Sequence, residues 1–232
     1  MSAFTRPNNG LTNRIAQSES RHISPQPAAS NESRDPTRTN ELVEGRFANR
    51  DAIEMRASET RKDREDAFRL VHRAYRDAGL TDDNPMQMRV MKHHLLDTTD
   101  VMVAKRNDNV CFTVSLVRDG EFGLPAESLF ATEIRAMREA GINLAEVSCV
   151  ASDCAEDSKK RRFEILVQMI ALTIHVARRR GIDRLMLAVH PRHARLYQRM
   201  FGCVPCTQVR EYAAVRGNPA VLCMHDFAQL DK

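Results

Sequence analysis

Tryptophan is absent from this 232-residue sequence, and aromatic residues make up only 5% of it. The six cysteines have no regular spacing and no apolar leader segment precedes them, so we expect reduced thiols in a cytoplasmic protein. The longest apolar run, residues 165–177, is interrupted by polar side chains and is too short to span a bilayer. The sequence therefore predicts neither a disulfide framework nor a transmembrane segment.

A large excess of charge of one sign is also missing. The 35 basic and 31 acidic residues leave a formal net charge of +4, which is too small to indicate binding to nucleic acid. This charge suits an acidic partner or a phosphate-bearing substrate. Cys203 and Cys206 have CxxC spacing, but no second CxxC motif or clustered histidine pair accompanies them, so we predict no metal site.

The first 49 residues differ in composition from the rest of the chain. They are rich in Ser, Asn, Arg, Pro and Thr and lack a periodic apolar pattern. Such a segment cannot bury enough surface to offset the entropy lost on ordering, so we predict a disordered tail over residues 1–49. A basic arm that docks on a partner is the alternative interpretation. We expect residues 50–232 to form one folded domain.

Apolar periodicity over residues 50–232 predicts alternating strands and helices. The expected strands cover residues 52–56, 101–105, 110–117, 143–151, 185–189, 204–212 and 219–227. The expected helices cover residues 60–79, 86–96, 129–140, 157–180 and 191–201. This order predicts an α/β (α+β) three-layer fold, with a mixed, mostly antiparallel sheet and helices on both faces.

Tyr197 is the first candidate catalytic residue. It lies in a short predicted helix that follows a buried strand and a break at His190-Pro191, and that ends at Phe201-Gly202. A phenol with a pKa near 10 is protonated at neutral pH and can serve as a general acid for a departing thiolate. A core tyrosine without a catalytic role is the alternative.

Glu146 and Ser148 are candidate catalytic residues on the predicted strand 143–151. Strand alternation predicts that these two side chains share one face, with Cys149 on the other face. A glutamate in an apolar strand is costly unless it is paired or faces a cleft, and desolvation makes its carboxylate a better base. Glu146 is thus a candidate acceptor of the proton of an ammonium nucleophile. The alternative is a glutamate on an edge strand, or one paired structurally with an arginine.

A basic segment opens the longest predicted helix. The unpaired backbone N–H groups and the helix dipole at its start, together with the added cations, favour an anion site. The anion would be a phosphopantetheine phosphate or an acidic carrier protein. The residues concerned are Lys159, Lys160, Arg161 and Arg162.

Several short motifs together resemble the catalytic core of the long-chain N-acyl amino acid synthases. These are GNAT-fold enzymes related to the acyl-homoserine lactone synthases, and the resemblance covers residues 50–228. Each motif is only moderately specific, but their order and spacing are a stronger signal. The motifs are Phe68-Arg69-Leu70-Val71 with Tyr75-Arg76, residues 113–116, residues 119–125, Ala145-Glu146-Val147-Ser148, residues 190–202 and residues 218–222.

The resemblance implies transfer of a long-chain acyl group from an acyl carrier protein thioester to an amino acid or similar small amine. No permanently bound cofactor is implied. Glu146 belongs to the family's Glu-x-Ser-Arg element, in which Cys149 stands where arginine is usual. Arg69 and Arg76 are expected to compensate for that arginine in binding substrate. The remaining expected substrate-binding residues are Ser115, Cys149, Val150 and His190.

Two other functions remain open at this point. One is a GNAT enzyme that uses acyl-CoA as co-substrate. The absence of glycine between Gly141 and Gly181 counts against it, because the usual acyl-CoA loop is glycine-rich. The other is a non-catalytic GNAT-like domain that binds an acyl carrier or lipid, which the departure at Cys149 favours. The lack of tryptophan argues against a homoserine lactone synthase.

Overall fold

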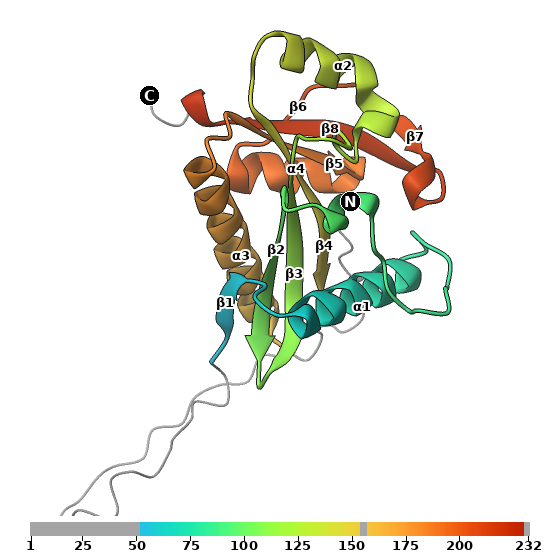
Figure 1. The fold of residues 1–232 in the computed structure, drawn as a ribbon, viewed down its shortest axis with the longest axis vertical. Helices are drawn as coiled ribbons and strands as arrows, with labels where there is room; N and C mark the ends of the chain where they lie inside the picture. The colour runs from blue at the N-terminus through green and yellow to red at the C-terminus, as the bar shows by residue number, and fades with distance from the viewer. Residues whose placement is uncertain (1–51, 154–156, 230–232) are drawn as a thin grey trace, which may run out of the picture. The chain divides into compact units, whose positions relative to one another are not determined.

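The computed structural model describes residues 52–153 and 157–229, so the predicted tail over residues 1–49 lies outside the described residues. Strands and helices alternate along the chain (Figure 1). In chain order the elements are β1 (Glu54–Ala57), α1 (Arg61–Asp77), η1 (Lys92–Leu95), β2 (Thr99–Arg106), β3 (Asn109–Arg118), α2 (Glu127–Glu139), β4 (Leu144–Ser152), α3 (Lys159–Arg179), β5 (Arg184–Val189), α4 (Pro191–Phe201), β6 (Val204–Pro205), β7 (Arg210–Tyr212), η2 (Ala213–Val215), β8 (Asn218–Asp226) and η3 (Phe227–Gln229).

The strands form one mixed sheet in the order β1-β2-β3-β4-β5-β8-β6, and β7 also pairs with β8. Only the β4–β5 pair is parallel, and every other pair is antiparallel. A parallel pair needs a crossover connection, and α3 provides it. The predicted mixed, mostly antiparallel sheet is confirmed.

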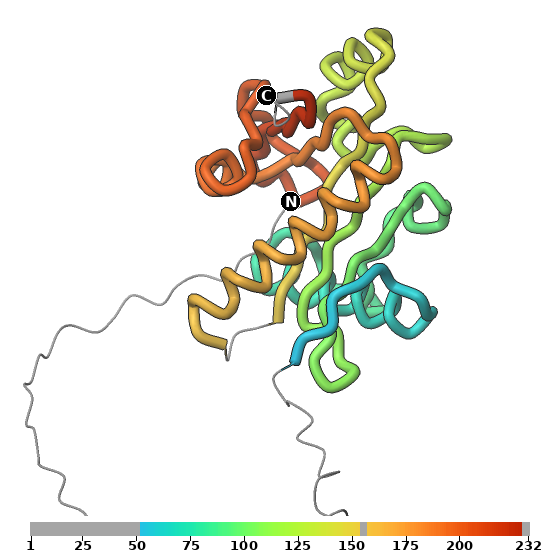
Figure 2. Tube along the Cα trace, turned by 90° about the vertical axis from the view of Figure 1, so that its left-hand side faces the viewer, coloured from blue at the N-terminus to red at the C-terminus, as the bar shows by residue number. Residues whose placement is uncertain are grey.

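Helices cover both faces of this sheet, as the three-layer prediction requires. Helices α1 and α2 pack on one face, where Tyr75 and Phe130 are fully buried. Helices α3 and α4 pack on the other, where Met169 and Tyr197 are fully buried. Figures 1 and 2 show α1 and α3 on opposite sides of the strands. We call these the α1 face and the α3 face of the sheet.

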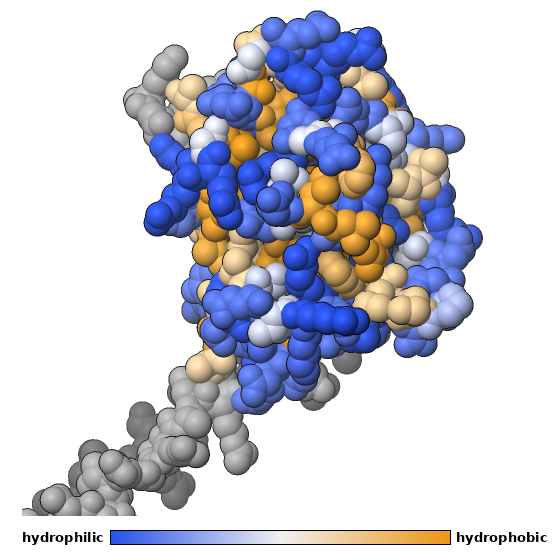
Figure 3. Space-filling view, in the orientation of Figure 1, coloured by the Kyte–Doolittle hydropathy of each residue, from blue (hydrophilic) through white to orange (hydrophobic). Residues whose placement is uncertain are grey.

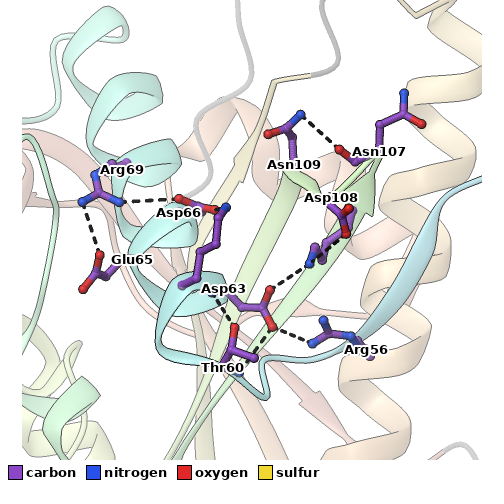
Figure 4. Close-up of polar contacts among 11 residues, drawn as sticks. Arg56, Thr60, Asp63, Glu65, Asp66, Arg69, Asn107, Asp108 and Asn109 are labelled. Atoms are coloured by element: carbon purple, nitrogen blue, oxygen red, sulfur yellow. Dashed lines mark hydrogen bonds and ion pairs between the residues drawn. The ribbon is translucent and has the colours of Figure 1, made fainter.

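The start of α1 is fixed by a buried carboxylate. Thr60 accepts a hydrogen bond from the N–H of Asp63, and the Asp63 side chain accepts one from the N–H of Thr60, which forms a capping box. Asp63 also accepts hydrogen bonds from Arg56 at 2.7 Å and Lys105 at 3.1 Å (Figure 4). Although burial opposes it, these cations hold the pKa of Asp63 well below its usual range. Asp63 therefore ties α1 to β1 and β2.

Two predicted elements differ from the structure. The helix expected over residues 86–96 is wrong, since only the 3₁₀ turn η1 forms there. The Asn84 side chain hydrogen-bonds both the N–H and the carbonyl of Met88, and Gln87 has a φ of +48°, so these residues form a turn instead. The strand expected over residues 204–212 is divided into β6 and β7. Thr207 lies between them and accepts the N–H of Leu222 through its hydroxyl group.

Candidate active site

Strands β4 and β5 separate part-way along their length. Their ladder joins only Leu144, Ala145 and Glu146 of β4 to Arg184, Leu185 and Met186 of β5. Beyond these pairs β4 continues beside β3, and β5 continues beside β8. In Figure 1, β2 and β3 stand vertically, whereas β8, the partner of β5, lies across the page. The inner edges of β4 and β5 are thus left without a strand partner beyond Glu146.

A β-bulge lies in β4 at the start of this opening. The register against β3 shifts between Ser148 and Ala151, and Cys149 has a φ of +50°. This conformation is unfavourable for a residue other than glycine, and such strain concentrates at functional sites. The bulge turns Cys149 into the core of the α1 face, whereas Val150 joins the core of the α3 face. The predicted position of Cys149 on the face opposite Glu146 is therefore wrong.

Glu146 is buried on the α1 face, with a relative exposure of 2%. Its Oε2 accepts a hydrogen bond of 2.6 Å from the N–H of Ala126, in the turn that precedes α2. Burial raises the pKa of its carboxyl group to about 7. Within the described ranges no arginine, lysine or histidine lies at ion-pair distance, so the structural arginine pair considered from the sequence is absent there. The carboxylate can accept a proton near neutral pH.

Ser148 and Ser115 face each other across β4 and β3 on the same side as Glu146. The sequence-based prediction that Glu146 and Ser148 share a face is confirmed. Ser115 lies 3.1 Å from Nε2 of His94, and Nδ1 of that histidine accepts the N–H of Met91. Nε2 therefore carries the proton and donates it to the Ser115 hydroxyl. Burial lowers the pKa of His94 to about 4, so the imidazole is neutral at pH 7.

Tyr197 lies on the α3 face, opposite Glu146. Its ring is 1% exposed and packs against Phe201, with the ring centroids 5.9 Å apart. On the other face Tyr75 of α1 is also 1% exposed, and burial raises the pKa of its phenol. The two tyrosines therefore lie in the cores of opposite faces of the sheet.

The basic segment and His190 lie at the ends of the two separating strands. Ser158 caps α3 by accepting the N–H of Arg161 at 3.1 Å, and α3 starts soon after β4 ends. Lys159 and Lys160 are exposed, while Arg161 and Arg162 are half-buried. His190 follows β5 and caps α4 by accepting the N–H of Arg192. Each group of predicted binding residues therefore stands at the open end of one strand.

Arg69 and Arg76 are not brought to this site. Both side chains are 45% exposed on the outer side of α1. Arg69 pairs with Glu65 and Asp66 (Figure 4), and Arg76 pairs with Asp77. An arginine that the sequence reasoning did not select, Arg89, is closer to the site. Its positive charge acts on the pKa values of Cys149 and Tyr212, two residues that Glu146 also influences.

Comparison with known families gives a match to most of the domain. The model of the N-acyl amino acid synthase FeeM family matches residues 66–226. This chain belongs to that family. Cys149 stands in this chain at the position of the arginine in the Glu-x-Ser-Arg element that the sequence resemblance implies. No curated protein matches the chain.

Solved structures show the same fold. FeeM, an N-acyl amino acid synthase from uncultured soil microbes, is 23% identical with a TM-score of 0.68, and the match covers 77% of this chain and 92% of FeeM. The acyl-homoserine lactone synthase LasI is 11% identical with a TM-score of 0.54, over 75% and 88% of the two chains. An acyl-CoA N-acyltransferase from Pseudomonas aeruginosa is 14% identical with a TM-score of 0.53, over 75% and 99%.

These findings make the synthase an acyltransferase with a GNAT-like fold. No helix in residues 52–153 and 157–229 is both long and apolar enough to cross a membrane. In the same residues no group of three or more His, Cys, Asp or Glu side chains is arranged to hold a metal ion. Cys203 and Cys206, the CxxC pair, are both free thiols.

Proposed function

We propose that this protein transfers a long-chain acyl group from an acyl carrier protein thioester to the amine of an amino acid or similar small amine. The observation that carries the proposal is Glu146. It is a buried carboxyl group without a cationic partner among the described residues, with its pKa raised to about 7, at the point where β4 and β5 separate. A group with these properties is suited to accept a proton from an ammonium ion near neutral pH.

The opening between β4 and β5 is the expected site of the thioester. An extended pantetheine arm carries amide groups that can pair with the free strand edges. Backbone N–H groups near the bulge at Cys149 and Val150 would stabilise the oxyanion of the tetrahedral intermediate. Lys159, Lys160, Arg161 and Arg162 would attract the pantetheine phosphate or acidic residues of the carrier.

The reaction needs no covalent enzyme intermediate. Glu146 takes a proton from the ammonium group, and the freed nitrogen attacks the thioester carbonyl carbon. A C–N bond forms as the C–S bond breaks, and Tyr197 gives its proton to the departing thiolate. The nitrogen then loses its second proton, which restores the Tyr197 phenol by way of solvent. The products are an N-acyl amino acid and the free thiol of the carrier.

The donor and the acceptor are tested together. Purified enzyme is given acyl-carrier protein or acyl-CoA with a panel of amino acids, and products are identified by mass spectrometry. We expect N-acyl amino acids with the carrier donor, and a loss of about 100-fold or more in the Glu146→Gln, Tyr197→Phe double variant. Equal turnover by the wild type and the double variant would remove both residues from the mechanism.

The same assay separates the remaining functions. Turnover with acyl-CoA but not with the carrier would make the protein a CoA-dependent N-acyltransferase. Carrier binding without release of thiol in the presence of any amine would favour a non-catalytic role. The exposed Arg76→Gln variant provides a control, because Arg76 lies on the outer side of α1 and should leave turnover unchanged.

A further inference from the structure

A cleft of about 470 Å³ opens beside Glu146 on the α1 face. Two residues of its wall, Leu124 and Pro125, directly precede Ala126, whose N–H binds the Glu146 carboxylate. A third, Tyr212, donates its hydroxyl proton to the carbonyl of Pro125 at 3.0 Å. The volume lies in the range of small-molecule sites. A ligand in this cleft would thus contact the turn whose next residue, Ala126, binds the proposed base.

The walls of the cleft combine apolar surface with a few polar groups. Met91, Phe122 and Leu124 supply apolar surface. Figure 3 shows apolar surface gathered midway along the corresponding face, between the polar surfaces of α2 above and α1 below. The polar groups of the wall are Arg89, Lys92, His93, Glu127, Ser128 and Tyr212.

Arg89 is a cationic group of the wall without a counter-ion among the described residues. Its Nη1 donates to the hydroxyl of Thr81 at 3.3 Å and its Nη2 to the carbonyl of Ala214 at 2.9 Å, which are both neutral acceptors. The guanidinium also lies 4.9 Å from the ring centroid of Tyr75. Its Nε is buried without a hydrogen-bond partner, and no carboxylate of the described residues is within ion-pair distance. A half-buried cation with neutral neighbours favours an anion.

The acidic residue of the cleft does not neutralise Arg89. Glu127 is paired with Arg138 at 2.9 Å, and this pair lowers the pKa of Glu127. Burial lowers the pKa of His93, so its imidazole is uncharged at pH 7. Lys92 adds a second positive charge near the ring of Phe122. The cleft therefore has an excess of positive charge and is suited to a carboxylate.

Arg89 and Glu146 act on the same small region. Burial raises the pKa of Tyr212 to about 12, the Glu146 carboxylate adds to this effect, and Arg89 opposes it. Burial also raises the pKa of Cys149, where Arg89 again opposes the effect. Tyr212 and Cys149 are therefore near both charged groups. An α-amino acid has its amine and carboxylate on one carbon, which fits a base and a guanidinium at neighbouring points.

We propose that Arg89 binds the carboxylate of the acceptor and sets the enzyme's preference for amino acids over other amines. It would do so from the loop after α1, in a chain that has Cys149 where its family usually has arginine. This inference rests on the proposed function, because it assigns the acceptor end of the same site. Arg89 is a specificity residue in this scheme and takes no part in the proton transfers.

The test compares two acceptors that differ only in the carboxylate. Kinetics are measured with the amino acid that the wild type acylates fastest and with its carboxamide. We expect Arg89→Gln to raise the KM for the amino acid about 10- to 100-fold, with little change in kcat and no change for the carboxamide. The matched control, Arg69→Gln, removes an arginine paired on the outer side of α1 and should change neither.

Two outcomes would overturn the assignment. One is an equal loss for both acceptors in a folded Arg89→Gln variant, which indicates a structural role. The other needs no variant: wild-type enzyme that acylates the amino acid and its carboxamide with equal kcat/KM does not recognise a carboxylate. Either outcome would reject the role of Arg89 and would leave the proposed acyl transfer intact. If the wild type acylates no amine from either donor, the proposed function fails instead. Calorimetric titration of the amino acid into wild type and Arg89→Gln then tests Arg89 separately.

Discussion

At the scale of single residues, burial decides what Glu146 can do. An exposed glutamate would be fully ionised at neutral pH and would be a weak base, whereas burial brings the pKa of this carboxyl group to about 7. The N–H of Ala126 gives the ionised form one hydrogen bond. The side chain is therefore held in position and can still exchange a proton.

The pH dependence of catalysis should report this group. A base must be ionised to act, so kcat/KM for the amine should rise about tenfold per pH unit below about pH 7 and level off above it. In Glu146→Gln this limb should disappear and the remaining rate should be about 100- to 10,000-fold lower. Steady-state kinetics from about pH 5 to about pH 9 measure both. An unchanged limb in the variant would assign it to another group.

The free energy of unfolding should also depend on the protonation of Glu146, and it should fall as the pH rises. Because the folded state binds this proton more tightly than the unfolded state, the stability from protonated Glu146 is complete below about pH 4.5 and is lost as pH rises through about 7. Glu146→Gln should therefore be more stable than wild type at pH 8, by at most about 3 kcal/mol, and similar at pH 4. Urea unfolding at the two pH values measures the difference. A variant less stable at both pH values would contradict it.

At the scale of elements, the two ends of the site are anchored differently. The start of α1 is held by Asp63, whose side chain is 3% exposed and bonded to Arg56 and Lys105. The start of α3 has a Ser158 cap and a run of cations that are exposed or half-buried. The first arrangement stabilises the fold. The second places cations near the surface, where Lys160 and Arg161 pair with Glu164.

Loss of the Asp63 carboxylate should destabilise the domain. Asp63→Asn leaves Arg56 and Lys105 without their partner, and we expect a loss of about 2 to 4 kcal/mol in the free energy of unfolding at pH 7. The loss should shrink as pH falls, since the native carboxylate has a depressed pKa and its contribution disappears on protonation. Asp66→Asn, which removes a more exposed pair with Lys62, should cost less than about 1 kcal/mol. Equal losses of stability in the two variants would contradict the structural role of the buried Asp63 carboxylate.

The basic start of α3 should matter for the carrier donor. Lys159→Glu with Lys160→Glu reverses two exposed charges, and we expect the KM for acyl-carrier protein to rise about tenfold or more, with the largest effect at low salt. The KM for the amino acid should not change. Kinetics at two ionic strengths measure the effect. A rise in KM for the amino acid alone would instead assign this segment to binding of the acceptor.

At the scale of the whole molecule, the sequence predicted the layers better than the site. Periodicity found the four α-helices of the described residues, but it also predicted a helix over residues 86–96, where the side chain of Asn84 forms a turn. Glu146 was found because a charge in an apolar strand is unusual. Arg89 was missed because it lies in that mispredicted segment, where one more arginine carries no signal. The bulge was missed because alternation assumes an unbroken ladder, and Cys149 is not a residue type typical of positive φ.

The bulge at Cys149 also has a consequence for protein engineering. Up to Ser148 the even-numbered positions of β4 face the site, and from Cys149 onward the odd-numbered positions do, as Cys149 and Ala151 show. A mutant library built on strict alternation would therefore randomise Val150, on the back of the sheet, and leave Cys149 unchanged. Selection for new acceptors should instead vary residues 148, 149 and 151 and keep Glu146, so that the chosen positions change from even to odd numbers at the bulge.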